Sequence, residues 1–486
     1  MKRLILIASA ALVFAAEAKL EKIADVTLAD QQGLVNFATK VGGFINEPML
    51  GMAPAGLFVA NPLATQGFGP ARGDGKFYAA VYMDGSGISG DIEHIEQLIM
   101  NNKVKFAVLY PVSSSKADFL AANPQSKEAD GVITWNEMMV IFSADGKYAA
   151  VASDADAARE AVAEAAKIPA LKKDEALRLR IFDAGMQLAV KAIESEKEAM
   201  NISAQYIEIY KSINKMEFSF CAGDYGIDFL GSVDCTPGSL LSKLGNKPLS
   251  SGTPLAFAGK DALIACAYAA DAAGSDGDAQ WKRLMAFAEK WGIKTNWISY
   301  EKKGVNSKLV LNPAALASYV KSEGKNKCEE LKKKSEEFMR DFMALGKHPL
   351  EIRSPEQAYA FYMKGAKVPV DAQTRFNQIL PGFSKKPCAG VGVFSFYGIL
   401  KSVGEAVCPL MDCKDAKEDL AFLAQLPSDD RSAIAYAWMK KDPTTHNYVV
   451  RFNPSEIRNL ATLLRMVQAE SQRKAEAAAE AIDDAN

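Results

Sequence analysis

The fold class is decided by the stretch AYAWMKKDPTTHNYVVRFNPSEIRNLATLL, residues 435–464. An aromatic strand ends in Lys440-Lys441, a turn follows, and a β-branched strand leads to Asn453-Pro454. Asn453 can accept the first helical N–H bonds, and Pro454 occupies a position where its missing N–H costs nothing. The stretch therefore predicts a β-hairpin whose second strand leads directly into a helix.

Two further segments share this order of elements. WISYEKKGVNSKLVLNPAALASYV, residues 297–320, repeats Lys-Lys and Asn-Pro, with Asn312 as the expected helix cap. MMVIFSADGKYAAVASDADAAREAVAEA, residues 138–165, has an Asp-Gly turn between two strands, and Ser153 or Asp154 as the cap. The matches favour an internal duplication. The alternative, that strand–cap–helix junctions are simply common, stays open.

Further strands and helices are expected between these segments. Apolar runs of strand length occupy residues 76–83, 104–112 and 388–397, and residues 215–235 alternate about a turn as a hairpin does. Apolar residues at three- and four-residue steps predict one helix of thirty or more residues from Leu179 and another over 325–345. The sequence thus predicts an α+β fold of two or three modules, each an antiparallel sheet packed with helices.

The expected organisation follows these segments. It comprises a signal peptide (1–18), an N-terminal module (19–172), a middle module with long amphipathic helices (173–347), a C-terminal module (348–470) and an Ala/Glu-rich helical tail (471–486). The last helix, from Pro454, fades into alanine and glutamate after Val467. It is expected to be either frayed or bound to a partner.

Charge and hydropathy bear on the classes of partner to expect. The 486 residues carry 57 Lys plus Arg against 59 Asp plus Glu. This balance gives no electrostatic reason to expect nucleic acid or an anionic membrane surface as a partner. No stretch after residue 18 approaches 18 uncharged apolar residues. A soluble mature chain without an integral membrane span is therefore expected.

Residues 1–18, MKRLILIASAALVFAAEA, have the pattern of a signal peptide. Two cations precede an apolar run of about a dozen residues, and Ala16-Glu17-Ala18 supplies the small residues that signal peptidase accepts. The run is too short for a membrane anchor. The alternative is a buried N-terminal helix. The pattern favours export to the periplasm or beyond, with cleavage before Lys19.

One glycine loop resembles a nucleotide site. Gly85-Ser86-Gly87-Ile88-Ser89-Gly90 matches G-x-G-x-x-G between a strand and an expected helix. Asp84 and Asp91 flank the loop and would repel phosphate, and residues 105–115 lack the acid that would hold a ribose. A solvent-exposed connection is expected there, with no cofactor.

Groups suited to catalysis or metal binding are scarce. His94, His348 and His446 stand far apart, and His446 is expected in a hairpin turn. Ser-x-x-Lys occurs six times, as chance allows in a lysine-rich chain. Seven cysteines leave at least one unpaired. A disulfide between Cys408 and Cys413 could close a short loop, and the sequence does not decide whether it forms. A zinc site is not expected. No catalytic, cofactor-binding or metal-binding residue is assigned.

Several phrases resemble a class of exported bacterial proteins whose function is not assigned. They are FAVLYPVSSSKADFL (106–120), GKYAAVASDADAAREAV (146–162) and PGSLLSKL (237–244), together with the signal peptide. The resemblance covers part of the chain, and its motifs are structural. It implies export and an α+β fold, and it carries no catalytic residues over to this chain.

These observations favour a non-enzymatic binding or scaffold component of the periplasm or cell surface. Its partner would be a protein or another envelope component. The alternative is an exported hydrolase whose catalytic residues are dispersed along the chain. One deep pocket with converging histidine and carboxylate groups would favour the enzyme, whereas a broad apolar patch would favour binding.

Processing gives the first testable prediction. Because the small residues at positions 16 and 18 follow the apolar run, we expect the mature protein to begin at Lys19 and to be released by osmotic shock. Mass spectrometry of the N-terminal peptide measures this directly. Protein retained in the cytosol with an intact Met1 would contradict it.

Overall fold

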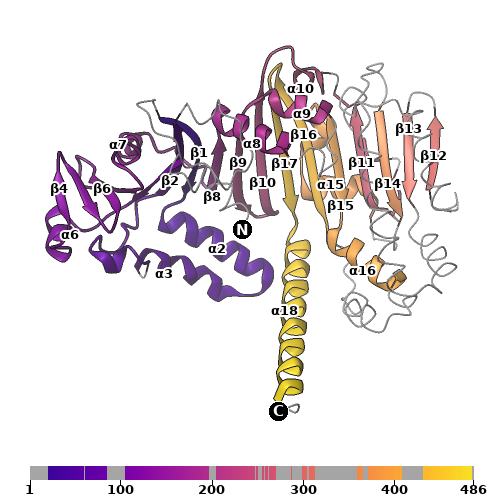
Figure 1. Cartoon of the computed structure of the whole chain (residues 1–486). Coiled ribbons are helices and arrows are strands. Elements are labelled where there is room, and N and C mark those ends of the chain that lie inside the picture. The colour runs from indigo at the N-terminus through magenta and orange to yellow at the C-terminus, as the bar shows by residue number, and fades with distance from the viewer. Residues whose placement is uncertain are drawn as a thin grey trace.

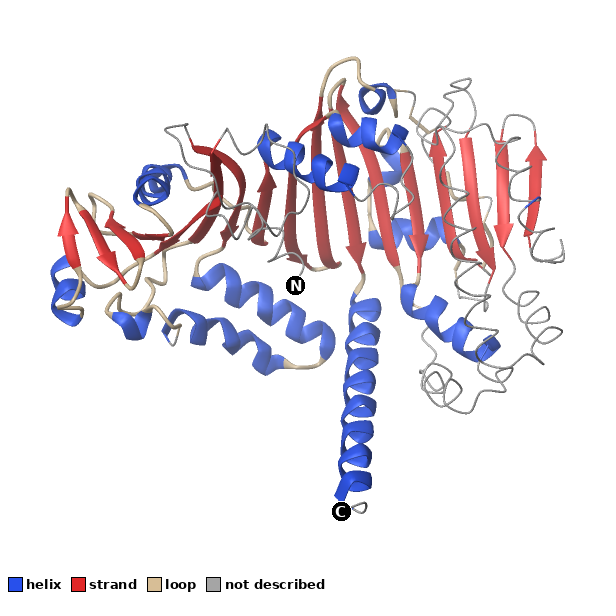
Figure 2. Cartoon of the chain, in the orientation of Figure 1, coloured by secondary structure: helices blue, strands red, loops and turns tan. Residues whose placement is uncertain are grey.

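The computed structural model describes residues 20–59, 61–84, 104–195, 204–246, 248–249, 254–256, 258–260, 262–269, 286, 298–303, 306–311, 358–364, 370–407 and 431–483. The described residues form an α+β fold, as the sequence predicts, in which helices pack against one long sheet (Figures 1 and 2). None of the described helices is long and apolar enough to cross a membrane.

The strands have the following bounds: β1 Leu20–Leu28, β2 Phe77–Asp84, β3 Val104–Tyr110, β4 Lys127–Ala129, β5 Val132–Trp135, β6 Met138–Phe142, β7 Ala149–Ala152, β8 Glu175–Ile181, β9 Ile213–Gly223, β10 Gly226–Cys235, β11 Ala262–Ala269, β12 Ile298–Lys303, β13 Asn306–Leu311, β14 Ala358–Lys364, β15 Gly390–Phe394, β16 Ile434–Asp442 and β17 Thr445–Phe452. The α-helices are α2 Gln31–Ile45, α3 Ala53–Val59, α6 Lys116–Ala122, α7 Ala155–Glu164, α8 Asp183–Ser195, α9 Ala204–Lys211, α10 Leu240–Lys243, α15 Ala372–Ile379, α16 Phe396–Val407 and α18 Pro454–Asp483. Short 3₁₀ turns are η1 Pro48–Met52, η2 Ala64–Gln66, η3 Ala165–Lys167 and η4 Phe383–Lys385.

All described strands belong to one sheet. Its spatial order is β4-β5-β6-β7-β3-β2-β1-β8-β9-β10-β17-β16-β15-β11-β14-β13-β12. Among these pairings β13–β14 runs parallel and the others antiparallel. The β1–β8 and β10–β17 ladders join segments that the sequence assigns to different modules. Backbone hydrogen bonds therefore continue across both expected boundaries, 172/173 and 347/348.

The hairpin-to-helix pattern is confirmed in two segments. β16 pairs with β17, which leads into α18, and β6 pairs with β7, which leads into α7. Asp154 is the cap of α7, since its carboxylate accepts from the N–H of Ala157, whereas the Ser153 hydroxyl accepts from the N–H of Phe106. In the third segment β12 and β13 form the expected hairpin. Asn312 and the helix expected after it lie outside the described residues, so the duplication stays a prediction.

The long helix predicted from Leu179 is wrong at its start. Residues 175–181 form β8, because Leu177, Leu179 and Ile181 alternate with arginines at the two-residue period of a strand. A helix begins only at Asp183. The Lys211 ammonium of α9 lies 2.9 Å from the Glu194 carboxylate of α8. Seventeen residues span about 25 Å along one helix, so α8 and α9 are two separate helices. The helix predicted over 325–345 lies outside the described residues.

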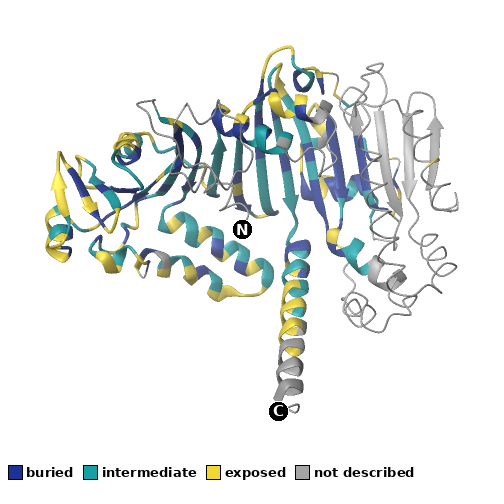
Figure 3. Ribbon diagram, viewed as in Figure 1, coloured by how far each residue is buried: buried dark blue, intermediate teal, exposed yellow. Residues whose placement is uncertain are grey.

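Helices pack on both faces of the central strands. Tyr448 of β17 packs with α8 and α10, whereas the next residue, Val449, packs with Phe376 of α15. Neighbouring strand residues point to opposite faces, so α15 lies on the side opposite α8 and α10 (Figure 1). α2 and α3 lie near the lower ends of the strands in the view of Figure 1, and α18 extends away from the sheet on that side (Figures 1 and 3).

The start of α18 gives a stability prediction. The Asn453 amide oxygen accepts from the N–H of Glu456 at 2.8 Å and from that of Ala433 at 3.2 Å, as the sequence predicts for a cap. Asn453→Ala removes both bonds, and we expect a loss of about 1 kcal/mol in the free energy of unfolding. Asn453→Ser, which keeps a capping oxygen, should lose less. Equal losses in urea denaturation would contradict the capping role.

Candidate functional site

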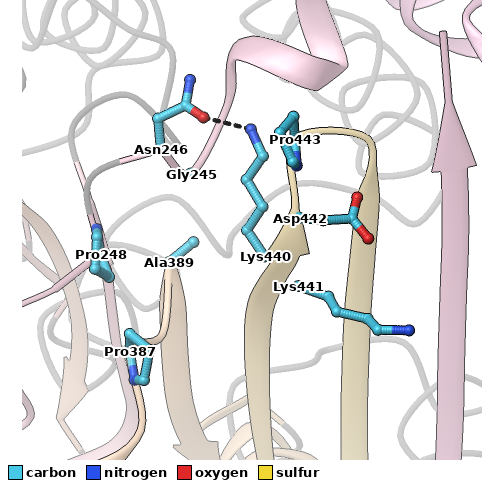
Figure 4. Close-up of a pocket in the computed structure, with 9 residues that line it drawn as sticks. All are labelled: Gly245, Asn246, Pro248, Pro387, Ala389, Lys440, Lys441, Asp442 and Pro443. Carbon is cyan, nitrogen blue, oxygen red and sulfur yellow. Dashed lines mark hydrogen bonds between the residues drawn. The ribbon is translucent and has the colours of Figure 1, made fainter. Parts of the chain in front are cut away.

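A cavity of about 300 Å³ opens at the end of the β16–β17 hairpin. Its lining residues are Gly245, Asn246, Pro248, Pro387, Ala389, Lys440, Lys441, Asp442 and Pro443. The Lys440 ammonium points toward Asn246 (Figure 4) and donates to the Asn246 side chain and to the carbonyls of Ser242 and Leu244. The Lys440 ammonium is therefore hydrogen-bonded within the protein and has a structural role. The cavity can hold a small polar molecule, but no described nucleophile and base meet in it.

A buried histidine lies beside this hairpin. His446 is the second residue of β17, so the expectation that it lies in the turn is wrong. The hairpin turn is shorter than the sequence suggests, and the ring is fully buried. Trp438 Nε1 donates to His446 Nδ1 at 3.1 Å, which places the proton of the neutral ring on Nε2. Burial, together with the charge of Lys440, lowers the pKa of His446.

Glu456 of α18 forms a second buried polar cluster. Its carboxylate accepts from the N–H of Tyr397 at 2.9 Å and from the hydroxyls of Ser395 and Ser432. Tyr397 lies in the first turn of α16, where a negative charge is stabilised by the helix dipole. Burial nevertheless raises the pKa of Glu456. This cluster is not among the candidates expected from the sequence, because its partners, Ser395, Tyr397 and Ser432, lie far from Glu456 along the chain.

These two titratable groups cannot act on one substrate. His446 lies at the start of β17, and Glu456 lies beyond its end, after Phe452. At about 3.3 Å per residue, the strand separates them by roughly 20 Å. Both side chains are also fully buried. Each is therefore a structural group, and their separation gives no support to a catalytic pair.

The described Ser-x-x-Lys serines and the described cysteines also lack the surroundings of a nucleophile. In two Ser-x-x-Lys segments, Ser113 with Lys116 and Ser212 with Lys215, each hydroxyl donates to a backbone carbonyl and each lysine pairs with a glutamate. The buried free thiols are Cys221, Cys235, Cys266 and Cys388. Burial raises the pKa of all four, to about 11 for Cys221, Cys266 and Cys388, which keeps these thiols protonated at neutral pH.

Several candidates that the sequence singles out lie outside the described residues. They are the glycine loop Gly85–Gly90 with Asp91, His94, His348, Cys328, and the pair Cys408 and Cys413. The exposed connection expected at the glycine loop therefore stays a prediction. Within the described residues, no three His, Cys, Asp or Glu side chains are grouped so that they could hold a metal ion.

Two faces of α18 are occupied by the rest of the protein. Leu463 and Met466 pack against Tyr397 of α16. On another face, Arg458 Nε donates to the carbonyl of Phe44, and Arg465 lies 2.7 Å from the Glu47 carboxylate. These contacts tie the first four turns of the helix to α16 and to the end of α2.

The third face of α18 carries exposed apolar side chains. Leu460, Leu464 and Val467 follow one another at steps of four and three, so they share one side of the helix. Leu464 is 59% exposed and Val467 is 43% exposed. Met49 and Met52 of η1, exposed by 71% and 66%, follow shortly after Glu47, the ion-pair partner of Arg465. We call Leu460, Leu464 and Val467 the docking surface.

Comparisons with known proteins leave the function open. No family model matches the chain, and no curated protein matches it. Among solved structures, crystal forms IV, III and I of a protein named TP0453 share 9%, 8% and 9% identity with this chain, at TM-scores of 0.23, 0.22 and 0.22. The alignments cover 44%, 47% and 50% of this chain and 77%, 79% and 80% of the other. Likeness this distant carries no argument about fold or activity.

The buried histidine predicts a pH dependence. The pKa of His446 is lowered in the folded state, so below about pH 6.5 the unfolded chain binds a proton that the folded chain resists. We therefore expect stability to fall as the pH decreases from about 7.5 to about 5.5. His446→Gln keeps an acceptor for Trp438 and does not titrate, so its loss should be smaller. Urea denaturation at the two pH values measures the loss for each protein. If the wild type and His446→Gln lose the same stability between these pH values, the assignment is contradicted.

Proposed function

We propose that this protein is an exported, non-enzymatic binding or scaffold component of the bacterial envelope, which acts by docking another protein on the exposed face of α18. The observation that carries the proposal is the pair of exposed apolar side chains Leu464 and Val467 on one side of α18. Contiguous exposed apolar side chains of this kind mark interaction sites.

The arrangement of reactive groups supports binding over the alternative of an exported hydrolase. In the part of the chain that the structure describes, His446 and Glu456 are buried and far apart, and the four thiols are buried. The cavity beside Lys440 holds a lysine whose donors are bound to acceptors. A hydrolase needs a nucleophile or activated water beside a base in a pocket, and the residues that line the described cavity include no Ser, Cys or His.

The occupant that fits α18 is a protein. Beyond Val467 the helix sequence carries four acidic residues, Glu470, Glu476, Glu480 and Asp483, against two basic ones, Arg473 and Lys474. Anionic lipid would repel these carboxylates. A protein partner can instead offer apolar side chains to Leu464 and Val467 and basic ones to the outer half. The balanced total charge likewise gives no support to a nucleic-acid partner.

The proposed export and the proposed class of the protein both rest on the sequence. The signal peptide, residues 1–18, lies outside the described residues, and it would deliver the chain to the periplasm or the exterior after cleavage near Ala18-Lys19. The resemblance to exported bacterial proteins of unassigned function rests on residues 106–120, 146–162 and 237–244 and is part of the proposal.

Site-specific photocrosslinking in exporting cells tests the proposal. A benzophenone side chain placed at Leu464 should form one discrete adduct with a protein that tryptic mass spectrometry identifies. The same side chain at Lys127, on the exposed strand β4 far from α18, should give none (Figure 3). Val467→Glu should reduce the Leu464 adduct by about fivefold or more, because it puts a charge into the apolar contact.

Two outcomes would overturn the proposal. One is the lack of any protein adduct at Leu464 when the protein is exported and folded, as judged by its circular dichroism. The other is flotation of the purified protein with vesicles of anionic lipid that Val467→Glu abolishes, since the docking surface would then bind lipid.

A further inference from the structure

The most exposed large apolar side chains among the described residues lie in one short segment. Met49 is 71% exposed, Met52 66% and Val59 64%. η1 ends at Met52 and α3 begins at Ala53, so residues 48–59 form one continuous helical run. Steps of three and seven residues place Met49, Met52 and Val59 on one side of that run. We call these three side chains the apolar ridge.

The apolar ridge faces away from the rest of the protein. Gly56 lies on the same side of the run, and a Cβ built there would meet nothing within 4 Å. On the opposite side, a Cβ at Gly51 would lie 2.5 Å from the hydroxyl oxygen of Thr39 in α2. Phe58 is also buried on that side, with its ring centre 5.1 Å from that of Phe77. In the view of Figure 1, α3 lies below α2, on the side away from the central strands.

No charged residue interrupts the segment that carries the apolar ridge. Residues 48–71 contain no Asp, Glu, Lys or Arg. The charges at its two ends are both paired: the Glu47 carboxylate lies 2.7 Å from the Arg465 guanidinium, and the Arg72 guanidinium lies 2.6 Å from the Asp74 carboxylate. A protein interface surrounds its apolar centre with a polar rim. This segment offers no charge for such a rim, so it matches an uncharged apolar layer better than a protein.

The backbone of the segment can enter an apolar medium. Hydrocarbon offers no hydrogen bonds, so backbone groups enter it only when they are already paired within the protein. The helical turns of residues 48–59 supply that pairing, and the Ala53 N–H donates to the Leu50 carbonyl where η1 meets α3. At the end of α3, the Phe58 carbonyl accepts from the N–H of Ala71 at 2.7 Å.

We propose that the apolar ridge inserts into the acyl layer of an uncharged lipid bilayer and holds the protein at the membrane surface. Methionine side chains are flexible and polarisable, so they adapt to a fluid apolar layer. Three side chains make a small anchor, so the attachment is weak and reversible. The apolar ridge and the docking surface lie on different helices. The inference therefore goes beyond the proposed function and does not depend on it.

Flotation with phosphatidylcholine vesicles tests the proposal. The purified mature protein should float with the vesicles. Met49→Glu with Met52→Glu should reduce the floating fraction by about fivefold or more, because carboxylates resist entry into hydrocarbon. Val59→Glu repeats the test at the other end of the ridge and should also reduce it. The matched control, Leu464→Glu with Val467→Glu, changes two exposed apolar side chains of α18 in the same way and should float like the wild type.

Circular dichroism establishes that each variant is folded before flotation. A folded wild type that does not float would overturn the proposal. A control that floats as poorly as the ridge variants would overturn it as well, since the apolar ridge would then not be the anchor.

Lipid composition tests the uncharged nature of the contact. Because residues 48–71 carry no charge, replacing part of the phosphatidylcholine by anionic phosphatidylglycerol should leave the floating fraction unchanged, at low and at high salt. Flotation that requires the anionic lipid would contradict the proposed contact.

A benzophenone side chain at Met52 distinguishes lipid from protein in exporting cells. It should react with acyl chains, so the tryptic peptide 41–72 should carry the added mass of a phospholipid. A discrete protein adduct without a lipid adduct would overturn the proposal. The photocrosslink from Leu464 tests the proposed function separately. A protein that does not float but still gives that crosslink would overturn membrane insertion and leave the docking role of α18 intact.

Discussion

Two cross-strand arginine–carboxylate pairs hold the sheet together where its sequence-distant parts meet. On the β1–β8 ladder Arg180 faces Asp25 directly and donates to both of its oxygens, at 2.8 and 2.7 Å. On the β10–β17 ladder Arg451 faces Asp228 in the same way. A one-residue slip would move either partner to the other face of the sheet, so each bidentate pair specifies the register of its ladder. The placement of α18 depends on the second pair, because β17 leads directly into that helix.

Burial makes these pairs matter more for register than for net stability. Asp25 is almost fully buried, and Tyr78 also donates to it at 3.0 Å. The free-energy cost of removing the two charges from water offsets most of the free energy gained from their attraction. A carboxylate left there without its arginine would be strongly destabilising, and this penalises every alternative strand pairing. The sheet is thus selected by the cost of wrong registers as much as by the gain of the right one.

Local signals in the sequence predicted the local structure well. Asn453-Pro454 marked the start of α18, and Asp145-Gly146 marked a hairpin, because capping and turn formation involve neighbouring residues. The prediction at Leu179 failed because a period-two strand beside an amphipathic helix also supplies apolar residues at four-residue steps. The Glu456 cluster and the β1–β8 ladder were out of reach, since their partners come from distant segments and nothing local specifies the pairing.

The base and the outer half of α18 have different sources of stability. At the base, Asn453 caps the helix, Glu456 joins it to the first turn of α16, and Arg465 pairs with Glu47. These contacts all lie before Val467, and the helix continues for about 24 Å to Asp483. Helical segments of this length are marginal in water without tertiary packing. The contacts at the base therefore fix the direction of α18 and, with it, the positions of Leu464 and Val467 relative to the sheet.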